Sequence, residues 1–457
     1  MDFAAQMEGR LVTAKELGAS EHQLKDINQG GLIVMPAIQV VGKYKTCQRC
    51  GNQRDFIENS CNCGNTCFYC LQCLAFGKLR TCDLLYHLPA SEQAYPWAQD
   101  ASYLAWSGQL SMQQTQASQE ICDSYQQRKG KHLVWAVTGA GKTEMVFQAI
   151  DIALRAGKKV AIATPRIDVA NELAPRFQVA FPKIAIQVLH GQSEQVYDHQ
   201  VAMTVCSTHQ LIRFRQAFDL LIIDEIDAFP YDGDPMLYQA SEGAVTTSGT
   251  QILLTATPNR TQLTAIEQKK LAVSILPARY HRHHLPVPKH MWVGDWRSTI
   301  QKGKIPKIFK HLLFNLIASK RRVLVFVPHI AYMLQLVKSC RGVFHGYHFE
   351  SVSSKDPDRV RKVQAMRDGA YDFLFSTTIL ERGVTFADID VIVLGSEDRT
   401  YTTASLVQIA GRVGRKAEFP KGSVYLLHYG KTKASMGAIR QIKSMNRQAR
   451  ERGLIDD

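Results

Sequence analysis

Residues 136–143 read "AVTGAGKT", a stretch with too few bulky side chains to pack a hydrophobic core. The apolar run 133–137 before it predicts a buried strand, and 144–150 after it has the spacing of a helix. A strand, a glycine-rich loop and a helix in this order form the setting in which backbone N–H groups and a helix N-terminus hold phosphate. The stretch is therefore predicted to bind a nucleoside triphosphate, ATP with Mg²⁺.

Each residue type in this loop has a separate task. Gly139 and Gly141 let consecutive backbone N–H groups turn toward one anion. Lys142 is expected to reach the β- and γ-phosphates, and Thr143 to place its hydroxyl on Mg²⁺. Ala136 stands where the motif commonly has its first glycine, a change that does not threaten catalysis. The expected nucleotide-binding residues are Thr138, Gly139, Ala140, Gly141, Lys142, Thr143 and Glu144.

The composition is that of an ordinary folded protein. The 457 residues are 45% hydrophobic and 21% charged, enough for two or three domains of roughly 150 residues each. The N-terminus carries early acidic residues and lacks the long apolar core of a signal peptide. No uninterrupted run approaches the roughly 18 apolar residues of a membrane helix. We therefore expect a cytoplasmic protein.

The positive charge is unevenly distributed. The formal net charge is +14, and ten Lys or Arg with no acidic residue lie between Asp295 and Glu350. The C-terminal region adds Lys431, Lys433, Arg440, Lys443, Arg447 and Arg450. This asymmetry favours a polyanionic partner, nucleic acid first and an acidic membrane surface second, with a solvated basic face as the alternative.

Eight of the eleven cysteines lie between Cys47 and Cys82. Because cytoplasmic thiols stay reduced, such clustering indicates metal rather than disulfides. The outer pairs, "CQRC" (Cys47, Cys50) and "CLQC" (Cys70, Cys73), are nineteen residues apart and suit a tetrahedral four-cysteine zinc site. Four thiolates leave no open position for water, which argues against a zinc-dependent enzyme.

Three inner cysteines complicate this assignment. Cys61, Cys63 and Cys67 are spare thiols, alternative ligands or part of a second site, and Cys82 has no assigned role. An iron–sulfur cluster is the alternative to zinc, since four thiolates hold it equally well.

From about residue 100, apolar strands alternate with amphipathic helices, as a parallel α/β sheet requires. A Pro- and His-rich basic segment, roughly 277–303, separates two such series. The expected strands are 132–137, 159–164, 202–208, 220–225 and 251–257 in the first series, and 322–328, 342–348, 372–378, 390–396 and 422–428 in the second. The predicted domains are an N-terminal segment (1–43), a four-cysteine zinc finger (44–88), a first lobe (89–298) and a second lobe (299–457).

Two further motifs carry charged side chains suited to phosphate chemistry. "LLIIDEID" (220–227) ends a strand on Asp224 and Glu225, where the first acid can hold Mg²⁺ and the second can polarise the attacking water. In "QIAGRVGR" (408–415), Arg412 and Arg415 could reach the γ-phosphate. The alternative for these arginines is a solvated surface helix.

The ordered motifs resemble the core of superfamily 2 helicases. They are "AVTGAGKT", "ATPR" (163–166), "STHQL" (207–211), "DEID" (224–227), "TATP" (255–258), "TTILERGVTF" (377–386) and "QIAGRVGR". The resemblance covers roughly 105–430 and implies two RecA-like lobes. It also implies Asp224 as metal ligand, Glu225 as catalytic base, Arg412 and Arg415 as arginine fingers, and Gln114 as the residue that reads adenine.

Longer stretches, together with the four-cysteine finger, resemble the ComFA family of late competence proteins over nearly the whole chain. This resemblance implies a DNA-stimulated ATPase at the inner face of the cell membrane that draws single-stranded transforming DNA through the ComEC channel. It implies a ComFC-like partner and homo-oligomers. The finger and the basic interval from Lys302 to Arg341 are candidate DNA-facing surfaces. The alternatives are a PriA-like replication-restart or RNA helicase, and an ATP-switched DNA-binding scaffold.

Overall fold

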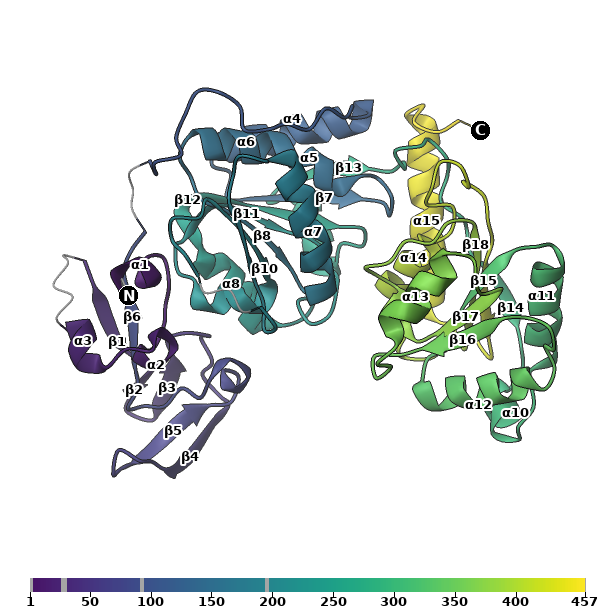
Figure 1. Ribbon diagram of the computed structural model, residues 1–457, viewed down its shortest axis with the longest axis horizontal. Helices are drawn as coiled ribbons and strands as arrows, with labels where there is room; N and C mark the ends of the chain where they lie inside the picture. Colours follow the sequence, from purple (N-terminus) through teal and green to yellow (C-terminus); the bar gives the residue numbers. More distant parts are fainter. Residues whose placement is uncertain (1–2, 26–30, 91–93, 194–196, 457) are drawn as a thin grey trace. The chain divides into compact units, whose positions relative to one another are not determined.

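Two open β-sheets flanked by helices organise the chain (Figure 1). The computed structural model describes residues 3–25, 31–90, 94–193 and 197–456. The chain divides into two compact units, which we describe separately. The first comprises Met1–Val134, Thr143–Thr255 and Asn259–Ser274, and the second comprises Trp135–Lys142, Ala256–Pro258 and Ile275–Asp457.

A seven-stranded sheet forms the centre of the first unit, and its strands β7 and β13 each continue into the second. The strand order is β13 (Ala272–Leu276), β7 (Lys131–Ala136), β12 (Val245–Thr255), β11 (Phe218–Ile223), β8 (Val160–Thr164), β10 (Met203–Ser207), β9 (Ile186–Leu189). The strands from β12 to β9 are parallel. Every residue of β8 and β10 is buried, as expected for parallel strands covered on both faces.

Helices connect these strands and cover the sheet (Figure 1). They are α4 (Met112–Gln126), α5 (Lys142–Met145), α6 (Phe147–Arg155), α7 (Ile167–Ala180), α8 (Pro235–Ala244) and α9 (Arg260–Glu267). Helix α6 buries Phe147, Ile150 and Leu154, which recur at helical spacing, and it packs against β8 and β11. The amphipathic run after the glycine-rich loop is therefore a helix, as predicted.

A six-stranded sheet forms the centre of the second unit. Its order is β14 (Lys289–Trp292), β19 (Val424–His428), β18 (Ile389–Leu394), β15 (Arg322–Phe326), β17 (Phe373–Ser376), β16 (Phe349–Val352). All five neighbouring pairs are parallel. Strand β14 belongs to this sheet and precedes residue 298, where the first lobe is expected to end. The lobe boundary at 298/299 stays a prediction.

The core of the second unit is rich in aromatic side chains. Trp296, Phe309, Phe373 and Phe375 are buried together with aliphatic residues of β15 and β18. The surrounding helices are α10 (Trp296–Gln301), α11 (Lys307–Ala318), α12 (Ile330–Arg341), α13 (Arg359–Arg367), α14 (Thr403–Ala410) and α15 (Lys433–Glu451).

One expected strand of the second series, 342–348, was wrong. These residues form turns after α12, where Phe344 N–H donates to the Cys340 carbonyl and Gly346 adopts a left-handed φ of 84°. The strand at this position is β16, which begins only at Phe349. Glycine terminates the preceding helix and makes the turn, so apolar residues alone did not place the strand.

The N-terminal part belongs to the first unit and contains small two-stranded antiparallel sheets. Its elements are α1 (Phe3–Met7), α2 (Ala14–Leu17), α3 (Glu21–Lys25), β1 (Ile33–Pro36), β2 (Ile38–Val41), β3 (Tyr44–Cys47), β4 (Phe56–Ser60), β5 (Thr66–Cys70) and β6 (Leu84–His87). Strand β1 pairs with β6, β2 with β3, and β4 with β5. Pairing therefore joins the segments that the sequence analysis separates at 43/44. In Figure 1, β4 and β5 extend away from the seven-stranded sheet.

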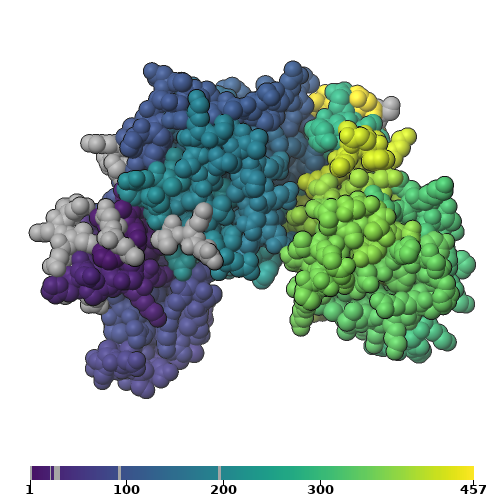
Figure 2. Space-filling model, in the orientation of Figure 1, coloured from purple at the N-terminus to yellow at the C-terminus, as the bar shows by residue number. Residues whose placement is uncertain are grey.

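This part is attached to the seven-stranded region by backbone hydrogen bonds. Leu11 N–H donates to the Arg213 carbonyl (2.8 Å), and Arg215 N–H donates to the Gly9 carbonyl (2.9 Å). Figure 2 shows the first residues, in purple, lying against the teal region that contains these partners. The N-terminal residues are thus integrated into the first unit.

Candidate nucleotide and metal sites

The glycine-rich loop follows β7 and leads directly into α5. Gly139 and Gly141 have φ of 83° and 75°, the left-handed region that side chains disfavour. Ala140 N–H donates to the Val137 carbonyl (3.1 Å) and closes the turn. The structure therefore has the strand, loop and helix that the sequence predicts here.

The side chains after the loop differ in exposure. Lys142 is half-buried at the start of α5, and Thr143 is only 9% exposed. Glu144 forms an ion pair of 2.7 Å with Arg176 of α7. The Glu144 carboxylate is thus oriented by a helix that follows β8.

The acidic pair leaves β11, which belongs to the same sheet as β7 and is separated from it by β12. Asp224 N–H donates to the Ala163 carbonyl (2.8 Å), and Glu225 N–H donates to Asp224 Oδ1 (2.9 Å). Glu225 has a φ of 55°, an uncommon conformation for a residue with a side chain. Such backbone conformations concentrate at functional sites.

Asp227 is a residue of this motif to which the sequence analysis gave no role. Its Oδ1 accepts a hydrogen bond of 2.9 Å from Thr255 Oγ1, which joins "DEID" to "TATP". A third acidic residue so soon after Asp224 and Glu225 is the signal that could have indicated it.

Gln114 lies at the start of α4 and is buried. Its Oε1 accepts from Ser111 N–H (2.8 Å), which caps the N-terminus of the helix. The neighbouring Gln113 is 9% exposed, so burial does not distinguish between the two glutamines. The adenine-reading role of Gln114 stays a prediction.

The two arginines of "QIAGRVGR" lie in different environments. Arg412 is 4% exposed and donates to the Glu381 carbonyl from Nε (2.9 Å) and Nη2 (2.6 Å), and from Nη1 to the Val384 carbonyl. Arg415 is half-buried. Arg412 is therefore not a solvated surface residue, and it holds the backbone of "TTILERGVTF".

Arg279 is a second residue that the sequence analysis missed. It is 1% exposed and donates to the carbonyls of Thr138 (Nε, 3.3 Å), Gly411 (Nη2, 3.3 Å) and Gly414 (Nη1), all in the second unit. Burial and the nearby Arg415 lower the pKa of Arg279 to about 9. Arg279 lies in the segment interpreted as a connection between the two lobes. That segment has no periodic pattern from which a role for Arg279 could be predicted.

Gly411 has no room for a side chain beside the glycine-rich loop. A Cβ there would lie 1.9 Å from Thr138 Oγ1. Together with Arg279, this contact links the loop to the end of α14 within the second unit.

The basic stretch between Asp295 and Glu350 contains two kinds of residue. Arg297 pairs with Glu397 and Asp398, Arg321 pairs with Asp388 and Asp390, and Arg322 donates to the carbonyls of Met366 and Ala387. The lysines are more exposed: Lys302, Lys304, Lys307, Lys320 and Lys338 all face solvent. Arg297, Arg321 and Arg322 therefore serve the fold, and the exposed lysines are the candidates for binding a polyanion.

The outer cysteines form a compact cluster. The sulfur atoms of Cys47, Cys50, Cys70 and Cys73 lie within 4.8 Å of one another, and all four residues are buried. Cys47 Sγ is 3.7 Å from Cys73 Sγ, and Cys50 Sγ is 3.4 Å from Cys70 Sγ. A tetrahedral zinc ion with Zn–S bonds of about 2.3 Å places its sulfur ligands about 3.8 Å apart. The predicted four-cysteine site therefore fits zinc.

The close packing of these sulfur atoms separates their pKa values. Hydrogen bonds from Cys47, Cys50 and Cys73 lower the pKa of Cys70, whereas those with Cys47, Cys50 and Cys70 raise the pKa of Cys73. Asn52 Nδ2 also donates to Cys70 Sγ (3.3 Å). These hydrogen bonds thus favour Cys70 as a thiolate, the form that binds metal.

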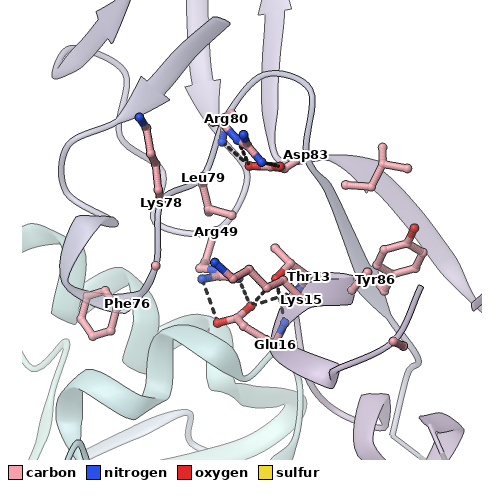
Figure 3. Close-up of a pocket in the computed structure, with 14 residues that line it drawn as sticks. Thr13, Lys15, Glu16, Arg49, Phe76, Lys78, Leu79, Arg80, Asp83 and Tyr86 are labelled. Atoms are coloured by element: carbon pink, nitrogen blue, oxygen red, sulfur yellow. Dashed lines mark hydrogen bonds and ion pairs between the residues drawn. The ribbon is translucent and has the colours of Figure 1, made fainter. Parts of the chain in front are cut away.

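An ion-pair network ties the first cysteine knuckle to the N-terminal helices (Figure 3). Arg49, within "CQRC", is buried and pairs with Glu16 of α2, which also accepts from Arg213 Nε (3.0 Å). Burial acts to raise the pKa of Glu16, but the attraction of Arg49, the Thr13 N–H and Arg213 lowers it overall. Thr13, Glu16 and Arg49 line a cavity of about 760 Å³ between α2 and the cysteine-rich segment.

Within the part of the chain that the structure describes, no helix is both long enough and apolar enough to cross a membrane.

Three family models match successive parts of the chain. Competence protein ComFA N-terminal domain matches residues 1–87, Type III restriction enzyme, res subunit, matches 107–260, and Helicase conserved C-terminal domain matches 304–417. The second of these matches covers most strands of the seven-stranded sheet, and the third covers four strands of the six-stranded sheet. The chain therefore contains the two halves of a helicase-like ATPase.

Two curated proteins are similar to the chain over nearly its whole length. Competence protein ComFA of Bacillus subtilis (strain 168) is 37% identical over 97% of this chain and 95% of its own. Competence protein ComFA of Streptococcus pneumoniae (strain ATCC BAA-255 / R6) is 38% identical over 96% of this chain and 98% of its own.

A solved structure supports the fold. S. cerevisiae Dbp5, bound to RNA and ADP BeF3, is 14% identical and has a TM-score of 0.51 over 74% of this chain and 91% of its own. At this identity the similarity concerns the fold alone, two RecA-like parallel-sheet lobes, and it agrees with the fold class predicted from the motifs.

Proposed function

Because this chain belongs to the ComFA family of competence proteins, we propose that it is an ATPase stimulated by single-stranded DNA and that ATP hydrolysis drives transforming DNA into the cell. The observation that carries the proposal is the pairing of a glycine-rich loop with the acidic pair Asp224–Glu225 on strands of one sheet. A superfamily 2 helicase-like ATPase uses this combination to hold and hydrolyse ATP.

The roles proposed in the nucleotide site follow the chemistry of each side chain. Backbone N–H groups from Thr138 to Glu144 bind the phosphates, and Lys142 places its charge on the β- and γ-phosphates. Thr143 and Asp224 would hold Mg²⁺. When bound, this ion would neutralise negative charge on the phosphate oxygens. Glu225 accepts a proton from the attacking water, and Gln114 contacts adenine.

The arginines of "QIAGRVGR" are proposed to stabilise charge on the γ-phosphate. Arg415 is half-buried and has a long side chain that can change direction. Arg412 donates to backbone carbonyls of Glu381 and Val384, so it would have to exchange these partners to contact phosphate. Arg415 is therefore the stronger of the two assignments, and Arg412 also orders the loop beside it.

Exposed lysines are proposed to contact the DNA backbone. Lys302, Lys304 and Lys307 lie close together in sequence around the start of α11 and face solvent. Contacts to phosphate do not depend on base identity, as a motor that accepts any sequence requires. The N-terminal cysteine finger is the second candidate surface.

Zinc at Cys47, Cys50, Cys70 and Cys73 is proposed from the spacing and the clustering of these cysteines. The remaining proposals follow from the family alone. They are a ComFC-like partner, the ComEC channel reached through partners, homo-oligomers, and a position at the inner face of the cell membrane.

The decisive experiment measures ATP turnover by the full-length protein alone and with single-stranded DNA, double-stranded DNA or RNA. We expect strong stimulation by single-stranded DNA, and Lys142→Ala should remove turnover under every condition. Stimulation by RNA or forked duplex instead would favour the helicase alternative. Failure to hydrolyse ATP under all conditions would favour the scaffold.

A matched pair of variants locates the DNA surface. Lys302→Ala combined with Lys304→Ala should weaken stimulation by single-stranded DNA and reduce its salt dependence, while turnover without DNA stays unchanged. Lys183→Ala combined with Lys270→Ala removes the same charge from exposed positions elsewhere and should change neither. Equal effects of the two double variants would contradict the assigned surface.

A further inference from the structure

We propose that Cys61, Cys63, Cys67 and Cys82 form a second, separate four-cysteine zinc site. The four sulfur atoms lie within 4.8 Å of one another, as in the outer cluster. Cys61 Sγ is 3.7 Å from Cys82 Sγ, and Cys63 Sγ is 3.5 Å from Cys67 Sγ. These separations again match the sulfur spacing of about 3.8 Å around tetrahedral zinc.

The backbone brings these four cysteines together from three segments. Strands β4 and β5 pair up to Ser60 and Thr66, and the turn between them carries Cys61 and Cys63. Two hydrogen bonds close this turn, from Cys61 N–H to the Asn65 carbonyl (3.0 Å) and from Gly64 N–H to the Cys61 carbonyl (3.0 Å). Cys63 and Cys61 are therefore fixed beside Cys67, which lies on β5 itself.

Cys82 arrives on a segment that runs along β5. Cys70 N–H donates to the Leu79 carbonyl (3.1 Å), and Thr81 N–H donates to the Phe68 carbonyl (2.9 Å). The antiparallel pairing of Tyr69 with Arg80 lies between these bonds. This alignment carries the chain from the outer cluster to the tip of the hairpin, where Cys82 meets the other three cysteines.

A nearby cation complements the charge that four thiolates would bring. Arg80 Nη1 donates to Cys61 Sγ (3.4 Å). The same guanidinium donates from Nε (3.2 Å) and Nη2 (2.9 Å) to Asp83, which orients it (Figure 3). Hydrogen bonds to ligand atoms from such neighbours fix the ligands and are a regular part of metal sites.

The two clusters share no ligand and hold separate ions. Cys67 and Cys70 are three residues apart on β5, so their Cα atoms lie roughly 10 Å apart at about 3.3 Å per residue and their side chains point to opposite faces of the strand. The complete set of four sulfur ligands leaves no position for water, so the second ion is structural rather than catalytic. It would fasten the hairpin tip, where β4 exposes all but one of its residues, to the segment before β6.

Elemental analysis of the full-length protein, purified under reducing conditions, tests the proposal. We expect two zinc ions per chain in the unaltered protein and one after Cys63→Ser combined with Cys82→Ser, both of which alter exposed residues. Asn62→Ala, an exposed non-ligand between two of the cysteines, should retain both ions. One zinc ion in the unaltered protein, or iron in place of zinc, would overturn the proposal.

A second measurement does not depend on the folding of any variant. Replacing zinc by cobalt in the unaltered protein should give thiolate-to-cobalt absorption corresponding to two four-sulfur sites, twice that of a single site. Titration of thiols in the denatured protein should recover all eleven cysteines. Loss of four thiols together with a single metal ion would show two disulfides at this position, and the proposed site would be refuted.

Discussion

The β4–β5 hairpin and the β8–β10 strand pair are held together in different ways. Every residue of β8 and β10 is buried, whereas β4 leaves four of its five residues exposed. In the hairpin region the buried groups are mainly cysteines and the ion-paired Arg49. The sheets are therefore stabilised by apolar burial, whereas the cysteine-rich segment would depend on ion pairs and on the proposed zinc. Each region should therefore unfold under conditions in which the other stays folded.

Metal removal should give the largest difference between the regions. Chelation, or Cys47→Ser combined with Cys50→Ser, removes binding free energy on the order of 10 kcal/mol from the cysteine-rich segment. We expect rapid proteolysis within 37–83 and unchanged protection of the two sheets, measured by limited proteolysis with mass spectrometry. Unchanged zinc content in the double variant would contradict the outer-cluster assignment.

Removing the proposed catalytic base should change chemistry without changing either region's stability. Glu225→Gln keeps the size of the side chain but cannot accept the proton, and we expect ATP turnover to fall by about 10³-fold or more. Zinc content and the thermal unfolding midpoint should match the unaltered protein. Normal turnover in both Glu225→Gln and Lys142→Ala would refute the nucleotide site.

Arg412→Ala should also lower turnover, on the order of 10³-fold, with nucleotide binding nearly intact. Because Arg412 bonds the carbonyls of Glu381 and Val384, the variant should also increase hydrogen exchange in 381–386. Arg412→Lys retains the charge but cannot bond both carbonyls, so it separates the two roles. Weak ATP binding with normal turnover would exclude an arginine finger.

The same chemical change in each region measures apolar burial directly. Ile162→Ala in β8 removes a side chain that is 1% exposed, and Ile57→Ala in β4 removes one that is 42% exposed. We expect a loss of about 2–5 kcal/mol for the first and within about 0.5 kcal/mol for the second, compared by thermal unfolding. Similar losses would show that the hairpin has an apolar core of its own.

Acidification should give the smallest effect, confined to the N-terminal part. The folded pKa of Glu16 lies below its ordinary value of 4.5, so its stabilising contribution is present above that pH and is lost as the pH falls below it. Glu16→Gln should remove this component of the pH dependence, measured as the proteolysis rate of residues 3–25. An unchanged pH profile in the variant would assign the effect to the cysteines instead.

The sequence predicted the interior strands but not the edges of the sheets. In the two large sheets, the strands that were missed or misplaced are β9, β13, β14 and β16, and each is the first or last strand of its sheet. Edge strands are covered on fewer sides: β9, β13 and β16 contain two buried residues each, and β14 contains none. Their apolar runs are therefore short, and the periodicity that reveals interior strands is weak.

The chemical motifs were predictable for a related reason. Phosphate chemistry requires particular residues at fixed spacing, so the motifs at 136–143 and 224–225 can be recognised from the sequence. Arg279 and the partners of Arg412 depend on contacts between distant segments, which leave no spacing pattern. The grouping of the inner cysteines could not be predicted for the same reason. Cys82 reaches them only because its segment pairs along β5.

The pairing of β1 with β6 has a consequence for the architecture of the chain. Pro36 lies opposite Leu84, and Ala37 N–H donates to the Asp83 carbonyl (2.9 Å). The two ends of the segment 37–83 therefore lie side by side at the end of the β1–β6 pair. The cysteine-rich part is thus an insertion into a simple hairpin. A short turn joining 36 to 84 would close that hairpin at little entropic cost, and the rest of the chain can be expected to fold without the insertion.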